Sequence, residues 1–179
     1  MIRRFLNIRD VMKELPPDGE TRNAIRDFNL APQTDGKARS VRDLAVTLGF
    51  DVSRVSHLGK MSGRLVQDAF AENGFLIEVN KHHSIQAQRW AVLHEIGHFF
   101  LHIVKNDPFA VNMAFDASGE TFYVDMNDEI EANSFAEAVL FGDGALKAAN
   151  SFYGGNNKKT AHRFGVSERV IQIARRRFC

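Results

Sequence analysis

The chain has 179 residues, and its 23 basic and 22 acidic side chains give a formal net charge of +1, which excludes a global attraction to nucleic acid or to an anionic membrane. An apolar content of 44% supports one domain with a buried core and a modest appendage, and no stretch is apolar for long enough to cross a membrane. The single cysteine, Cys179, excludes an internal disulfide framework and, with no signal-peptide-like apolar run near Met1, predicts a cytoplasmic protein.

The first 39 residues predict a helix followed by a linker. Apolar side chains recur at helical spacing in Ile2, Phe5, Ile8, Met12 and Leu15, and Pro16-Pro17 ends that pattern. Residues 16–39 are rich in Pro, Gly, Asp and Asn, which is typical of a linker or an ordered loop. We therefore treat residues 1–39 as an N-terminal helix and linker that precede the core.

Residues 40–80 predict two helices and a strand. Ser40 and Asp43 form a capping-box-like start for a helix through Leu48, which Gly49 ends. A second helix fits residues 63–72. After the turn at Asn73-Gly74, residues 75–79 give the clearest strand of the chain.

The run His94-Glu95-Ile96-Gly97-His98 matches the H-E-x-x-H signature of a zinc site on a helix. Two His four residues apart are offset by about 40° around an α-helix and by about 6 Å along it, so both rings leave the same face. They can therefore bind one ion, and Glu95 can take a proton from a zinc-bound water.

The surrounding sequence supports that interpretation. Residues 86–104 contain no proline, and their apolar side chains recur at helical spacing. The alternative is a core helix whose two His bond to backbone groups. We disfavour it, because a glutamate on a largely apolar helix is costly unless it has a partner or a function.

A third metal ligand has to come from another part of the chain. In one zinc arrangement a third His follows six residues after the second, but Leu101 and Val104 stand in that region here. His102 would have turned about 80° from His94, so we expect it to hydrogen bond near the helix end instead.

A second predicted helix, from about Asn127 to Leu140 with Asn127 or Asp128 as its cap, offers that ligand. Glu129 and Asn133 share one face of it, so Glu129 can bind the metal while Asn133 orients a ligand. Glu131 lies about 200° around from Glu129, and we interpret it as a solvated carboxylate near the helix start. Glu137 and Asp143 are expected to face solvent.

Two further features concern the substrate. The strand at residues 75–79 comes just before the zinc helix, so its edge could pair with an extended peptide, and residues 121–124 could form a second strand. Four side chains are candidate donors to an oxyanion, and the sequence does not choose among them: Tyr123, His82, His83 and His162.

Charge is uneven in the second half of the chain. Between Lys105 and Lys147 there are nine acidic residues and no basic ones, which could balance a divalent ion and steer a basic partner, or form a solvated acidic face. Residues 151–179 are basic and resemble a helix-turn-helix, with Gly165 at the turn and Ser167 as the next cap. Packing of this segment on the core is favoured over DNA binding, because one basic helix is weak support for groove binding.

Beyond the zinc motif, the chain resembles the ImmA/IrrE family of zinc metallopeptidases over residues 40–142. The resemblance rests on these runs: Gln88 to His102, Glu129 to Ala136, Val41 to Gly49, Gly63, and Ile77 to Asn80. In the place of the Leu-Leu-Met-Pro that commonly follows the second run in the family, this chain has Val139-Leu140-Phe141-Gly142, so the helix end and the substrate wall there are expected to differ.

The resemblance implies an α+β fold: a small gluzincin-like core at residues 40–150, mostly helical, with a short sheet beside the zinc helix. It implies Zn²⁺ bound by His94, His98 and Glu129, with Glu95 as the base. The implied partner is a helix-turn-helix repressor, often encoded next door, whose cleavage switches on a mobile element or a stress regulon. Some relatives act beside a toxin–antitoxin partner.

We therefore predict a zinc-dependent endopeptidase that cleaves a regulatory protein. One alternative is a component of a repressor or toxin–antitoxin system that binds its partner without cutting it. The other is a DNA-binding regulator that uses the basic C-terminal segment.

Overall fold

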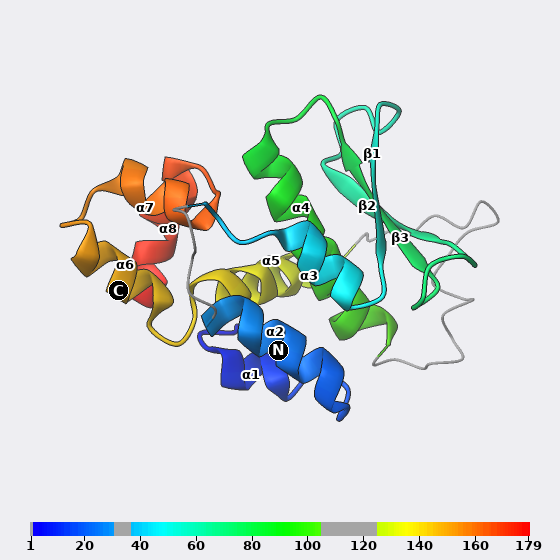
Figure 1. Cartoon of the computed structure of the whole chain (residues 1–179), viewed down its shortest axis with the longest axis horizontal. Helices are drawn as coiled ribbons and strands as arrows, with labels where there is room; N and C mark the ends of the chain where they lie inside the picture. The colour runs from blue at the N-terminus through cyan, green and yellow to red at the C-terminus, as the bar shows by residue number, and fades with distance from the viewer. Residues whose placement is uncertain (1, 31–36, 105–124) are drawn as a thin grey trace.

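The computed structural model describes residues 2–30, 37–104 and 125–179. It has a small α+β fold in which helices predominate (Figure 1). The helices before and after a short sheet are α1 Ile8–Met12, α2 Gly19–Leu30, α3 Val41–Thr47, α4 Ile85–His98 with its π-helical extension η1 Phe99–Ile103, α5 Met126–Phe141, α6 Ala145–Phe152, α7 Asn157–Phe164 and α8 Glu168–Phe178. The sheet consists of β1 Asp51–Val55, β2 Gly63–Gln67 and β3 Phe75–Asn80.

The strand β3 lies in the middle of the described sheet. It pairs in parallel with β1, where Val52 aligns with Ile77, and antiparallel with β2, where Leu65 aligns with the same Ile77. The predicted strand at residues 75–79 is therefore confirmed, but the expectation that its edge pairs with a substrate is wrong, because both of its edges already carry a neighbouring strand.

The segment predicted as a helix over residues 63–72 begins instead as the strand β2. Leu65 is fully buried while its neighbours Arg64 and Val66 are only half-buried, which is the alternating burial of a strand. Five residues in register with β3 decide the conformation, because a short apolar run cannot distinguish helix from strand by itself.

The N-terminal part also differs from the prediction. The first helix is only one turn long, Ile8–Met12, and Asn7 caps it. The expected linker contains α2, where Asp18 accepts a hydrogen bond from the backbone N–H of Thr21 and where Ile25 and Phe28 are buried. These two residues are three apart, so one face of α2 enters the core although the segment is rich in polar residues.

The long helices α4 and α5 form the centre of the molecule and pack against each other (Figure 1). The sheet lies on one side of them and the group α6–α8 at the opposite end. α5 begins one residue before the predicted Asn127, and its cap is Asp125 rather than Asn127 or Asp128. One cluster of buried apolar side chains runs through all these layers, from Phe5 to Ala174.

The C-terminal helices pack on the core through aromatic side chains. Phe141 at the end of α5 makes edge-to-face contacts with Phe164 of α7 and Phe178 of α8. Gly165 adopts a left-handed backbone and Ser167 caps α8, as predicted from the sequence. In the described residues, no helix combines the length and apolarity that a membrane crossing requires.

Candidate metal centre

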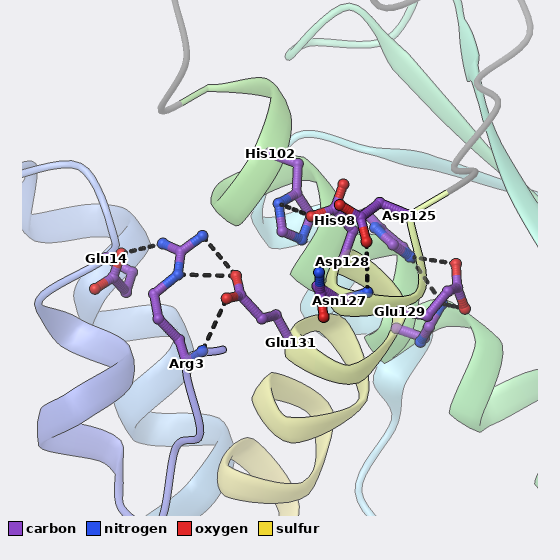
Figure 2. A network of polar contacts seen from close by, with 10 residues as sticks. Arg3, Glu14, His98, His102, Asp125, Asn127, Asp128, Glu129 and Glu131 are labelled. Carbon is purple, nitrogen blue, oxygen red and sulfur yellow. Dashed lines mark hydrogen bonds and ion pairs between the residues drawn. The ribbon is translucent and has the colours of Figure 1, made fainter. Parts of the chain in front are cut away.

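A close approach of α4 and α5 brings the candidate ligands together. The approach occurs at Gly97, where a Cβ atom would lie 3.1 Å from the carbonyl oxygen of Ala132 and 3.2 Å from the ring of Phe135. Any larger residue would push the two helices apart, so the glycine inside the motif sets their separation. As a result, Glu129 of α5 faces His98 of α4 (Figure 2). It also lies close to His94 on the same helix.

Three ligand atoms meet at this point. The Nε2 atoms of His94 and His98 are 2.9 Å apart, and the Glu129 carboxylate oxygens lie 3.2 Å and 3.1 Å from them. Tetrahedral zinc with bonds of about 2.0–2.1 Å places its ligand atoms about 3.3 Å apart. The three side chains therefore form a group that could bind a metal ion with little movement.

Asn133 and Trp90 lie behind His94. The Oδ1 atom of Asn133 is 3.1 Å from Nδ1 of His94 and accepts a hydrogen bond of the same length from the indole N–H of Trp90. The structure thus places Asn133 where the sequence predicted it, against the ring nitrogen of His94 that faces away from His98 and Glu129. Trp90 was not predicted, since its spacing in the sequence suggested only a packing role.

Glu95 lies deep beside the group, with 5% of its surface exposed. Burial raises the pKa of its carboxyl to about 7, an effect that nearby His94 opposes. Among the described residues its Oε2 atom is buried and has no hydrogen-bond partner. A buried carboxylate oxygen with nothing to bind is costly, so this atom fits a site completed by a metal and its water.

The charges of the group are already suited to a metal. Polar contacts with the imidazole rings of His94 and His98, whose Nε2 atoms lie within 3.2 Å of its oxygens, hold the pKa of Glu129 well below its usual range. Burial lowers the pKa of His98 to about 4, so this ring is neutral near pH 7 and its Nε2 atom can bind a metal. Burial also lowers the pKa of His94, but the interactions with Glu129 and Glu95 outweigh it and the net shift is upward.

Comparison with known proteins identifies the family of this chain. A family model described as the IrrE N-terminal-like domain matches residues 53–174, which is more than half of the chain. The chain belongs to the ImmA/IrrE family. A search of curated proteins found no significant match. The match covers the C-terminal helices α6 and α7 and most of α8, beyond the residues on which the sequence resemblance rested.

The chain therefore carries a metallopeptidase-type domain, and its family is of the zinc metallopeptidase type. His94, His98 and Glu129 are the three described residues that form a potential metal group, and they are the ligands that the resemblance implied. His102 does not join them. Its ring lies 5.3 Å from that of His98, and its Nδ1 atom is 3.5 Å from Asp128 at the start of α5.

Glu131 is not the solvated carboxylate that the sequence suggested. Its side chain is 8% exposed and accepts hydrogen bonds from both the backbone N–H and the Nε atom of Arg3, each 2.8 Å long (Figure 2). Arg3 also pairs with Glu14 at 2.8 Å. Burial raises the pKa of Glu131, but the contacts with Arg3 outweigh it and lower the pKa overall. The prediction failed because the partner lies 128 residues away in sequence.

Glu137 does not face solvent as the sequence suggested, whereas Asp143 is exposed as expected. The Glu137 side chain is 13% exposed and forms an ion pair with Arg177 of α8. The buried turn of α5 that carries Glu137 therefore binds the C-terminal helix. Nothing near Glu137 in the sequence signals this partner, which is 40 residues downstream.

The candidate oxyanion donors remain predictions. Tyr123 and the expected strand at residues 121–124 lie outside the described residues. His82 is exposed and His83 half-buried in the turn before α4, and His162 is exposed on α7. A further neighbour of the site is Gly63, where a Cβ atom would lie 3.6 Å from Oε1 of Glu95, so the start of β2 borders the candidate base.

Proposed function

We propose that this protein is a zinc-dependent endopeptidase that cleaves a regulatory protein, and that the substrate is a helix-turn-helix repressor. The observation that carries the proposal is the position of Glu95. It is buried next to three ligand-type side chains, with a carboxylate oxygen that has no partner among the described residues. A structural glutamate on a core helix would have its oxygens hydrogen bonded, as Glu131 does.

In peptide hydrolysis, one set of residues would bind the metal and another residue would transfer the proton. A zinc ion held by His94, His98 and Glu129 would supply Lewis acidity toward water and the scissile carbonyl. Glu95 accepts the proton that water loses when its oxygen attacks the carbonyl carbon, and it then gives that proton to the leaving amine nitrogen as the C–N bond breaks. A pKa of about 7 suits both roles near neutral pH.

The choice of a repressor as substrate rests on the family resemblance and on charge. The sequence has nine acidic residues and no basic ones between Lys105 and Lys147, and this span includes the start of α5 at the metal group. Arg3 and Arg177 pair with two of these nine, Glu131 and Glu137, so the steering of a basic DNA-binding domain rests on the charge of the other seven and acts mainly through a faster encounter.

The test is to co-express helix-turn-helix proteins from the genome that encodes this chain, starting with any that is encoded next to it, with the wild type or with Glu95→Gln, and to measure the intact mass of the partner. We expect a truncated partner with the wild type only. Glu95→Gln keeps the shape of the side chain and should still bind zinc, which metal analysis of the purified variant checks. Cleavage by the zinc-loaded variant would rule out Glu95 as the base.

A partner that stays intact with both proteins and copurifies in a stable 1:1 complex would instead support the non-cleaving alternative. The departure from Leu-Leu-Met-Pro does not favour that alternative. The amide of Asn29 in α2 donates to the carbonyl oxygens of Val139 and Gly142, so the altered helix end packs against α2.

DNA binding by the C-terminal segment also remains the less favoured alternative. Ser167 and Val170, in the position of a recognition helix start, face a cavity of about 280 Å³ that they share with Trp90 of α4. Two of the basic side chains have partners within the protein: Arg177 pairs with Glu137, and Arg175 donates to the carbonyl oxygen of Gly155.

A further inference from the structure

Trp90 and His94 lie one turn apart on α4 and share one oxygen atom on α5. The indole Nε1 of Trp90 and the Nδ1 of His94 are each 3.1 Å from Oδ1 of Asn133. All three side chains are half-buried, and Trp90 packs against the apolar core. A carbonyl oxygen has two lone pairs, so it can accept both hydrogen bonds at once.

The chemistry of these groups fixes the position of each proton. An indole N–H can only donate, so the amide atom that faces Trp90 has to be the oxygen of Asn133. That oxygen can only accept, so Nδ1 of His94 carries the hydrogen. In a neutral imidazole the lone pair is then on Nε2, the atom that points to His98 and Glu129.

Without the indole N–H, the amide of Asn133 loses the contact that distinguishes its two ends. Rotation by half a turn would place the NH₂ group against Nδ1 of His94, which would then have to accept. The hydrogen of the neutral ring would move to Nε2 and block the atom that binds metal. Metal binding would then require this hydrogen to move back to Nδ1, next to the NH₂ group of Asn133. The free energy needed for that change would reduce the metal affinity.

We propose that Trp90 is a positioning residue that holds Asn133 with its oxygen toward His94 and thereby keeps Nε2 of His94 available to a metal. The proposal rests on the metal site of the proposed function and adds to it the residue that selects the ligand tautomer. Trp90 acts through its hydrogen bond to Asn133.

The experiment measures zinc affinity of the full-length protein by competition with a chromogenic chelator. Trp90→Phe removes the N–H and keeps an aromatic ring, and we expect zinc binding to weaken by about tenfold, the size typical for an outer partner of a ligand. Val170→Ala is the matched control. Val170 lines the same cavity as Trp90, and the substitution enlarges that cavity while it leaves the hydrogen bonds of Asn133 in place. We expect it to leave zinc affinity unchanged.

Rescue separates the proton argument from simple packing. Asn133→Asp presents two acceptor oxygens and no donor, so it accepts from His94 whichever way it is turned. In that background, Trp90→Phe should no longer weaken zinc binding. An equal loss with Asn and with Asp at position 133 would mean that Trp90 acts through packing alone and would overturn the proposal.

The results also distinguish this proposal from the proposed function. A wild-type protein that binds no zinc would overturn both. A wild type that binds zinc, together with Trp90→Phe that binds it equally tightly, would overturn the role of Trp90 and leave the metal site intact. Thermal unfolding of each metal-free variant shows that the measured protein is folded.

Discussion

The first turns of α5 carry two glutamates, two residues apart, that differ in exposure and in their partners. Glu129 faces His94 and His98 and keeps 45% of its side chain exposed. Glu131 instead faces Arg3, with 8% of its side chain exposed (Figure 2). The more exposed carboxylate is the one with oxygens beside other ligand atoms. The buried one has its oxygens bonded to an arginine. Accessibility together with the identity of the partner, more than burial alone, separates a candidate ligand from a structural ion pair.

The largest effect should come from removing the ligand itself. Glu129→Ala should weaken zinc binding by more than about 100-fold, the upper end of what the loss of an outer partner costs. Glu131→Ala should change it by much less, because Glu131 points away from the two His. Chelator competition measures both. A larger loss with Glu131→Ala would mean that the two glutamates have been assigned the wrong roles.

For folding stability the order of the two glutamates should be reversed, with Glu131 contributing more than Glu129. Glu131→Gln in metal-free protein should lower the free energy of unfolding by about 2 kcal/mol, since it weakens hydrogen bonds to a charged partner. Urea denaturation gives the value. The matched control, Glu129→Gln, should cost less than half as much because nearly half of that side chain is exposed and solvent screens its contacts. Equal losses of unfolding free energy in the two variants would contradict the assignment of Glu131 as the structural carboxylate.

Gly97→Ala tests the distance between α4 and α5. Its Cβ would lie 3.1 Å from a backbone oxygen, so the helices have to separate slightly, with a stability cost of about 1–3 kcal/mol from overpacking. Zinc affinity should fall as well, because Glu129 moves away from the two His. Unchanged zinc affinity in this variant would show that the ligand geometry does not depend on this contact.

The smallest effect concerns pH. The pKa of Glu131 lies below its ordinary value of 4.5, so its pair with Arg3 stabilises the fold above that pH and is lost as the pH falls through the lowered pKa. Metal-free wild type should therefore lose stability below about pH 4.5 with an extra slope of at most about 1.4 kcal/mol per pH unit relative to Glu131→Gln. If the free energy of unfolding falls with pH equally steeply in the wild type and in Glu131→Gln, the Arg3–Glu131 pair does not contribute to acid sensitivity.

Local patterns predicted much of the candidate site. The spacing of His94 and His98 placed both rings on one helix face, and the spacing of Glu129 and Asn133 placed the two residues on the face of a second helix. The structure puts these four side chains together. Helical periodicity is set by bond geometry, so it can be recognised without knowledge of the rest of the fold.

The failed predictions involve partners that are distant in sequence. Glu131 and Glu137 looked solvated because Arg3 and Arg177 lie 128 and 40 residues away. The segment beginning at Gly63 looked helical because its pairing with β3 is invisible within a short window.

The sequence by itself indicated the candidate metal ligands, the candidate base and the family resemblance, because each depends on side-chain chemistry at recognisable helical spacing. Only the tertiary structure decided that the amide oxygen of Asn133 faces both His94 and Trp90, and that Glu131 is hydrogen bonded to Arg3. These features depend on how separate elements pack, and packing is set by the burial of the whole core rather than by any one segment.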